Sequence, residues 1–94
     1  MRDGEFEWDD AKAAANFAKH KVSFHAARWA FADVFAVERE DDTEDYGEPR
    51  FNLLGMVEGR VLFVAYTVRG EIIRIISACE AEPYERRLYH EENI

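Results

Sequence analysis

Four residues of this chain have side chains that could bind an anion or transfer a proton beside it. Arg50, Arg69 and Arg74 carry guanidinium groups, which hold carboxylates or phosphates through paired hydrogen bonds. His20 stands between two lysines, and a histidine side chain ordinarily exchanges protons near neutral pH. We therefore take these four residues as the candidate catalytic group.

Each of these residues also has a structural interpretation, which the sequence leaves open. His20 falls where the first helix is expected to end, so it could simply cap carbonyl groups there. Arg74 lies among isoleucines in an expected strand, and a guanidinium in that position needs water, a carboxylate or a phosphate. Glu48 could accept a proton, but two residues from Arg50 it is better explained as the ion-pair partner of that arginine.

Other polar and reactive residues give weaker signals. Lys19 and Lys21 are either solvated charges or phosphate contacts. Tyr66 could stack on a nucleotide, although a strand tyrosine more often belongs to the core. Cys79 has Glu80 beside it rather than a basic group, so neither a lowered thiol pKa nor a nucleophilic role is expected.

The spacing of acidic, histidine and cysteine residues predicts neither a metal site nor a cofactor. Residues 40–45 form an acidic run without the spaced ligands and turn glycine of a cation-binding loop, so we interpret them as a solvated loop. The sequence also lacks a Cys/His cluster at zinc spacing and a glycine-rich phosphate loop.

Length and composition predict one domain over residues 1–94, since a chain of this size has too little interior for two cores. With 48% hydrophobic residues and no apolar run near the ~20 residues of a membrane span, we expect a globular protein without membrane contact. The lone cysteine and the absence of a secretory leader pattern fit a reducing cytoplasm. A net charge of −8 disfavours broad nucleic-acid binding, so any such site must be local.

The candidate residues must be positioned by two β-branched runs, 61–67 and 72–78. Both are too short for confident helices, and together they predict the central hairpin of a small sheet. A two-residue loop at 69–70 would place Thr67 opposite Ile72.

Two helices are expected before this hairpin. Asp9 or Asp10 can cap the first, and Ser23 can cap the second. Helical spacing predicts that they turn these residues inwards: Trp8, Ala11, Ala15, Ala18 and Val22, then Phe24, Ala27, Phe31 and Val34.

Further strands are expected at the start of the chain, over 34–40 and over 51–57. Pro83 suits the first turn of a last helix, from which Leu88 or Tyr84 would return to the sheet. The pattern predicts an α+β fold, an antiparallel meander packed by an N-terminal α-hairpin and followed by a C-terminal helix.

Two groups of residues follow a family pattern in order and spacing. In the first half they are Trp8, Asp9, Lys12, Asn16, Lys19, His20, Val22, Phe24, Ala27, Phe31 and Asp33. In the second half they are residues 47–50, Gly55, residues 66–70 and 74–78, Glu85, Arg86 and Tyr89. This pattern, from about residue 6 to about residue 89, resembles that of the BrnT toxins.

The resemblance implies a RelE-like α+β fold and a metal-independent endoribonuclease, the toxin of a bacterial type II toxin-antitoxin module. Its partners would be an RNA substrate and a BrnA-type ribbon-helix-helix antitoxin, and it would reach operator DNA only through that antitoxin. The catalytic residues would be His20, Arg50, Arg69 and Arg74. The RNA contacts would be Lys19, Lys21, Glu48, Tyr66 and Ser77.

Two positions depart from the family pattern. The family usually has arginine after Ser-Ala and then lysine or arginine, whereas this chain has Cys79 and Glu80. The exchange removes positive charge beside the expected RNA surface and predicts a weakened ribonuclease. The first alternative is a catalytically inactive binding module that acts only in complex with an antitoxin. The net charge of −8 leaves a second, a small acidic structural domain unrelated to RNA.

Overall fold

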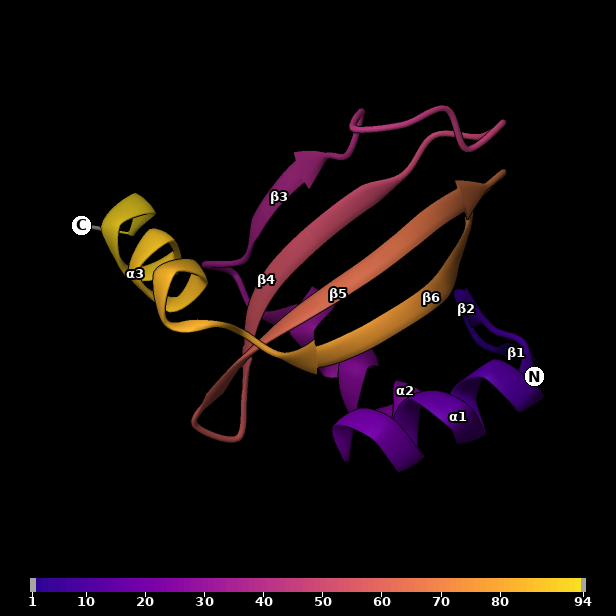
Figure 1. Cartoon of the computed structure of the whole chain (residues 1–94), viewed down its shortest axis with the longest axis horizontal. Helices are drawn as coiled ribbons and strands as arrows, with labels where there is room; N and C mark the ends of the chain where they lie inside the picture. Colours follow the sequence, from indigo (N-terminus) through magenta and orange to yellow (C-terminus); the bar gives the residue numbers. More distant parts are fainter. Residues whose placement is uncertain (1, 94) are drawn as a thin grey trace.

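The computed structural model describes residues 2–93 and has an α+β fold (Figure 1). Its elements are β1 (Arg2–Asp3), β2 (Phe6–Glu7), α1 (Asp10–His20), α2 (Phe24–Ala27), the 3₁₀ helix η1 (Arg28–Ala32), β3 (Val37–Glu40), β4 (Phe51–Val57), β5 (Arg60–Arg69), β6 (Ile72–Glu80) and α3 (Pro83–Glu92). The predicted order of strands and helices is confirmed, with β1 in addition. Residues 1 and 94 of the expected domain lie outside the described part. None of the described helices is long and apolar enough to cross a membrane.

The six strands form one sheet in the order β1-β2-β6-β5-β4-β3. The central strands β4, β5 and β6 form the predicted antiparallel meander. β2 and β6 run parallel, which brings the start of the chain beside its last strand. The sequence did not predict this pair, because nothing local in either segment specifies the other as its neighbour.

The predicted register of the β5–β6 hairpin is wrong. The two-residue loop lies one residue later, at Gly70 and Glu71, so Thr67 pairs with Arg74 and not with Ile72. Gly70 has a φ of 64°, a conformation that glycine adopts at little cost. Gly70 is therefore the first residue of the loop and not the second. The pairing shifts again in the middle of the two strands, where a bulge interrupts the ladder.

One buried polar side chain fastens α1 to the sheet. The Asn16 amide donates to the carbonyl oxygens of Val22 and Ala78 at 3.0 and 2.8 Å. Its Oδ1 accepts a hydrogen bond from the N–H of Ala78 at 3.1 Å. Asn16 thus pairs with both the N–H and the carbonyl oxygen of Ala78, which lies beyond the part of β6 that pairs with the short β2.

The inward face predicted for α1 is wrong for its alanines. Ala11, Ala15 and Ala18 are exposed, whereas Asn16 is buried and Ala13 is half-buried. The physical reason is that the Asn16 amide can pair with open backbone groups of β6, and an alanine methyl group cannot.

The second predicted helix divides into α2 and η1. Ser23 caps α2 as predicted, because its hydroxyl accepts a hydrogen bond from the N–H of Ala26 at 3.0 Å. η1 lies so close to β4 that a Cβ at Gly55 would come 2.5 Å from the carbonyl oxygen of Ala30, so this position requires glycine. Val34 is 89% exposed and not inward-facing, because η1 ends before it and the following strand begins only at residue 37.

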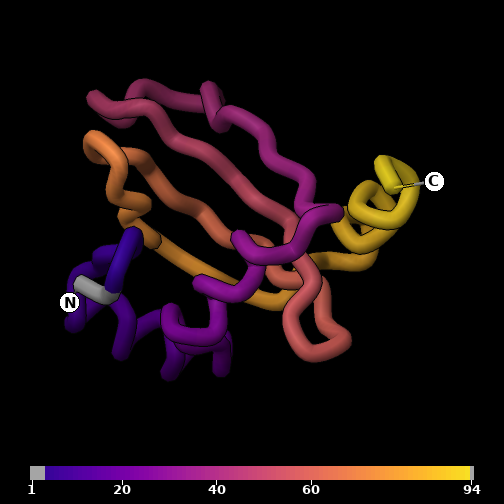
Figure 2. Tube along the Cα trace, turned by 180° about the vertical axis from the view of Figure 1, so that it is seen from behind, coloured from indigo at the N-terminus to yellow at the C-terminus, as the bar shows by residue number. Residues whose placement is uncertain are grey.

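The sheet has two unlike faces. α1, α2 and η1 pack against one of them, which we term the helix face. Figure 2, the view from behind, shows this segment lying in front of the sheet. The core of the helix face includes Trp8, Val22, Phe24, Ala27, Ala30, Leu53, Leu62, Val64, Tyr66, Ile75 and Ala78. The opposite face has a smaller cluster, beside α3, of Leu54, Val61, Ala81 and Tyr89. Leu88 packs against that cluster, whereas Tyr84 is 63% exposed.

Asp33 joins α3 to the sheet. Its Oδ2 accepts hydrogen bonds from the Tyr89 hydroxyl at 2.6 Å and from the N–H of Met56 at 2.7 Å, and Oδ1 accepts from the N–H of Phe35 at 2.9 Å. Burial alone would raise the pKa of Asp33, but these hydrogen bonds hold it below its usual value. Burial and the bond to Asp33 raise the pKa of Tyr89 to about 12.

Candidate functional site

The three candidate arginines and Ser77 lie on the face of the sheet opposite α1, α2 and η1, which we term the open face. Side chains alternate along a strand, and paired residues of neighbouring strands share a side. By this alternation the open face carries Arg50, Asn52, Ala65, Thr67, Arg69, Arg74 and Ser77. α3 packs against the end of this face that holds Leu54 and Val61, at the left in Figure 1. The arginines lie at the other end.

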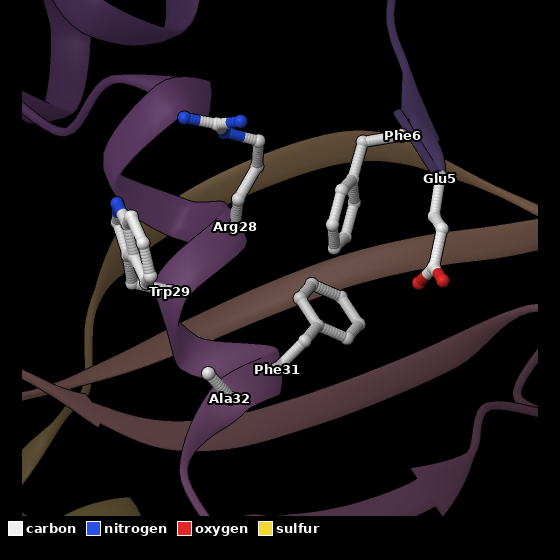
Figure 3. Close-up of a pocket in the computed structure, with 6 residues that line it drawn as sticks. All are labelled: Glu5, Phe6, Arg28, Trp29, Phe31 and Ala32. Carbon is white, nitrogen blue, oxygen red and sulfur yellow. The ribbon is translucent and has the colours of Figure 1, made fainter. Parts of the chain in front are cut away.

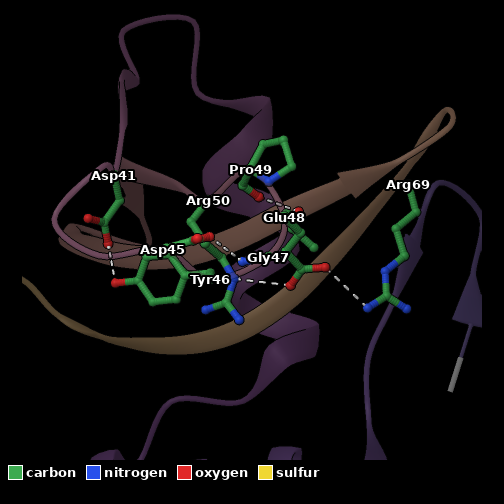
Figure 4. Close-up of polar contacts among 9 residues, drawn as sticks. Asp41, Asp45, Tyr46, Gly47, Glu48, Pro49, Arg50 and Arg69 are labelled. Carbon is green, nitrogen blue, oxygen red and sulfur yellow. Dashed lines mark hydrogen bonds and ion pairs between the residues drawn. The ribbon is translucent and has the colours of Figure 1, made fainter.

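Glu48 lies between two of these arginines (Figure 4). Its Oε2 accepts a hydrogen bond from Arg50 Nε at 3.1 Å, and its Oε1 lies 3.4 Å from Arg69 Nη2. The Arg50 guanidinium also lies over the ring of Tyr46, 4.3 Å from the ring centroid. The ion pair between Glu48 and Arg50 that the sequence favoured is confirmed.

The two arginines determine the charge state of Glu48. Partial burial raises the pKa of the carboxyl group, but the hydrogen bonds and charges of Arg50 and Arg69 outweigh this effect, and the pKa of Glu48 lies below its usual value. Glu48 is therefore ionised at neutral pH. A carboxylate between two guanidinium groups can accept a proton, and it occupies the hydrogen-bonding positions that a phosphate would use.

Two hydrogen bonds that the sequence analysis missed position this segment. The hydroxyl of Thr67, which is 1% exposed, donates to the carbonyl oxygen of Pro49 at 2.5 Å. The Tyr46 hydroxyl donates to Asp41 Oδ2 at 3.1 Å, so the acidic run includes a structural carboxylate. A signal was available for Thr67, because a hydroxyl group in an apolar strand needs a partner.

Arg74 adjoins this group from the neighbouring strand. It pairs with Thr67, and its Nη1 lies 3.7 Å from Glu7 Oε2 in β2. The strand arginine thus has the carboxylate partner that its position requires. Three guanidinium groups therefore gather here, with Glu48 and Glu7 in ion pairs and with the carboxylates of Asp41 and Asp9 also near Arg50 and Arg74. Clustered guanidinium groups can bind a phosphate if it displaces these carboxylates.

His20 lies apart from the arginines. α1 starts after β2, which pairs with the beginning of β6, and by residue 16 it has reached the backbone of Ala78 near the end of β6. His20 ends the helix beyond that point, whereas Arg69 and Arg74 lie at the β5–β6 turn (Figure 1). The structure therefore brings the three arginines together and does not bring His20 to them.

Lys21, and not His20, caps the C-terminal end of α1. The backbone N–H of Lys21 donates to the carbonyl oxygen of Phe17 at 2.8 Å, and its ammonium group donates to the carbonyl oxygen of Ala18 at 3.1 Å. Lys19 and His20 are exposed. This helix end is a basic surface separate from the open face.

The other predicted RNA contacts divide between the two faces. Tyr66 lies on the helix face and is 2% exposed, with its ring centroid 4.9 Å from that of Phe31 and 5.5 Å from that of Phe51. This is the core position that the sequence favoured, and it leaves no ring surface for a nucleotide. Ser77 is half-buried on the open face opposite Ala65.

Cys79 also lies on the open face, paired with Phe63. Burial raises the pKa of its thiol, and the carboxylates of Glu85 and Glu82 raise it further. The expectation that the pKa of this thiol is not lowered is confirmed.

The helix face has a hollow of its own, which differs in chemistry (Figure 3). Its volume is about 320 Å³, and the rings of Phe6 and Phe31 meet beside it with centroids 5.3 Å apart. Trp29, which also lines it, is 62% exposed. Its lining includes one acidic residue, Glu5, and one basic residue, Arg28, and so it lacks the three clustered guanidinium groups of the open face.

The family model of the ribonuclease toxin BrnT, of type II toxin-antitoxin systems, matches residues 8–85. The match spans Glu48 and the three arginines of the open face. The chain belongs to the BrnT family. A BrnT protein is the ribonuclease toxin of a type II toxin-antitoxin module, which implies an RNA target and an antitoxin partner. No curated protein matches this BrnT chain closely enough to count as a relative.

Proposed function

We propose that this BrnT protein cleaves RNA on its open face and that the cleavage needs no metal ion. The supporting observation is the Glu48 carboxylate between Arg50 and Arg69, with Arg74 on the neighbouring strand. Cleavage without a metal needs a base for the 2′-OH proton and cations for the charge that develops on the phosphate. This group of side chains contains both.

In the proposed reaction Glu48 takes the proton of the 2′-OH group. The 2′-oxygen then attacks the adjacent phosphorus, the bond to the 5′-oxygen of the next nucleotide breaks, that oxygen takes a proton from water, and a 2′,3′-cyclic phosphate remains. Arg50, Arg69 and Arg74 stabilise the charge on the phosphate oxygens in the transition state. The prediction that His20 is the acid-base residue is the alternative to this step, because His20 lies on a separate surface at the end of α1.

The test is cleavage of a single-stranded RNA by the purified chain at low salt, with and without EDTA. Cleavage continues in EDTA. Arg69→Ala lowers the rate by about a hundredfold, the usual cost of losing one group that stabilises the transition state. Arg60→Ala is the matched control, since Arg60 is an exposed arginine at the opposite end of the same strand. Loss of cleavage in EDTA, or equal losses in both variants, would contradict the proposal.

We also propose that the neutralising partner is a BrnA-type ribbon-helix-helix antitoxin and that the antitoxin, not this chain, contacts operator DNA. The net charge of −8 repels a DNA backbone and favours a basic segment of the partner. Both would act in the cytoplasm. Co-expression with the protein encoded beside it gives a heteromer that weakens with salt, and separate species at low salt would contradict this.

A further inference from the structure

A second hollow, of about 140 Å³, lies on the open face between the sheet and α3, and we term it the α3 hollow. Its apolar wall comes from Val37, Leu54, Phe63 and Leu88. Tyr84 from α3 and Asn52 from β4 also line it.

The α3 hollow adjoins the arginine end of the open face. Asn52 follows Arg50 by two residues, so their side chains share a face and stand roughly 7 Å apart along the strand. Asn52 pairs with Ala65, and two residues further along that strand Thr67 pairs with Arg74. A single nucleotide can therefore reach from a phosphate at the arginines to a base in the α3 hollow.

Two side chains of the α3 hollow have the chemistry that recognises an unpaired base. The Tyr84 ring is 63% exposed in the first turn of α3, and bases splayed from single-stranded RNA stack on such rings. The Asn52 side-chain amide has no hydrogen-bond partner among residues 2–93. Its donor and acceptor atoms can pair with the edge of a base.

The charges around the α3 hollow favour a neutral group over a phosphate. Arg39, which also lines it, is already paired with Glu92 at 2.5 Å. Glu85 lies on the wall, where its Oε1 accepts a hydrogen bond from the N–H of Glu82 at 2.8 Å. The carboxylates at the α3 hollow repel a phosphate and therefore suit an uncharged base. The guanidinium groups at the other end of the open face suit the phosphate of that nucleotide.

We propose that the α3 hollow binds one nucleobase of the RNA whose phosphate lies against Arg50 and Arg69. Tyr84 stacks on the base, and the Asn52 amide contacts its edge and so discriminates among bases. This inference rests on the proposed ribonuclease function of the open face.

The experiment measures binding of four fluorescent 2′-O-methyl oligonucleotides, one for each base, by anisotropy at several salt concentrations. These strands cannot be cleaved, because the 2′-oxygen carries no proton. Tyr84→Ala weakens binding of all four by about tenfold, in the range of lost base stacking, with no change in salt dependence. Asn52→Ala reduces the differences in affinity among them. Phe17→Ala, which removes a 50% exposed ring from α1, changes nothing.

The outcomes separate this inference from the function on which it rests. Unchanged binding by Tyr84→Ala, in a protein whose unmodified form binds RNA and whose Arg69→Ala variant binds it more weakly, would overturn the base site alone. No binding by the unmodified protein would overturn both. Equal losses in Tyr84→Ala and Phe17→Ala would also overturn the base site, since only the first ring lines the α3 hollow.

Discussion

The two faces of the sheet use polar side chains in opposite ways. On the helix face Asn16 is 8% exposed, and its three hydrogen bonds all go to backbone groups of the chain itself. On the open face the side chains of Glu48 and Arg69 are 27% and 54% exposed and meet at 3.4 Å. Removing a buried hydrogen-bonding partner is costly, whereas an exposed ion pair contributes little to stability. The open face therefore holds charges that can exchange partners for a ligand with little effect on the fold.

The largest effect is expected for Glu48→Gln. It keeps the size of the side chain and removes the base, so RNA cleavage falls by about a thousandfold, within the usual range for a general base. The free energy of unfolding in urea stays within about 0.5 kcal/mol, because the carboxylate is partly exposed. Glu38→Gln, at an exposed glutamate of β3, is the control for both measurements. Faster cleavage by Glu48→Gln would contradict the proposed base and show that the Glu48 carboxylate only competes with RNA for Arg50 and Arg69.

On the helix face the corresponding loss is in stability. Asn16→Leu leaves backbone groups of Val22 and Ala78 without their hydrogen-bond partner, so the free energy of unfolding falls by about 3 kcal/mol. Ala15→Leu adds similar bulk at an exposed position of the same helix and serves as control. Urea unfolding measures both, and a loss below about 1 kcal/mol for Asn16→Leu would contradict this account of the face.

Positive charge added at the end of β6 should raise activity. Cys79→Arg combined with Glu80→Lys restores the usual family charges, and we expect cleavage to rise by about tenfold at low salt and less at high salt. The gain is limited because Glu82 and Glu85 lie near Cys79 and neutralise part of the new charge. The triple variant Ala11→Arg, Ala14→Arg and Ala15→Arg adds the same three charge units on the exposed surface of α1 and controls for net charge. If the double variant stays folded without detectable cleavage, the protein is a binding module.

The smallest effect concerns the bond between α3 and Asp33. The pKa of Tyr89 is raised to about 12 in the folded protein, so its contribution to stability is fully present below about pH 10, the ordinary tyrosine value, and is lost as the pH rises through 12. Tyr89→Phe should cost about 1 kcal/mol at pH 7. Urea unfolding should show this difference from the unmodified chain disappearing between pH 10 and 12. A constant difference would contradict the assignment.

The sequence predicted the parts of the fold that depend on near neighbours. The caps at Asp9 and Ser23 and the meander over residues 51–57, 61–67 and 72–78 are specified by short-range patterns, and the structure confirms them. The hairpin register depended on which residue opens the turn. Gly70 could take either position of the loop, and the pattern alone did not decide between them.

The candidate site was predicted in part for the same reason. Glu48 and Arg50 lie two residues apart, so their ion pair could be inferred from spacing. The separation of His20 from the arginines could not, because it depends on how α1 crosses β6, and that crossing is set by the contact of Asn16 with Ala78 across 62 residues. The α3 hollow could not be predicted either, because it forms only where α3 packs against the sheet.

The pH dependence of RNA cleavage by the unmodified chain tests most directly whether the reaction takes place on the open face. The pKa of Glu48 lies below its usual value because of Arg50 and Arg69, so the proposed base stays ionised down to about pH 5. We predict a constant rate from about pH 8 to about pH 5 and a fall only in more acidic solution. His20→Ala then cleaves at close to the unmodified rate. A fall in rate already between about pH 8 and about pH 5, together with loss of cleavage in His20→Ala, would contradict the account and place the reaction at the end of α1.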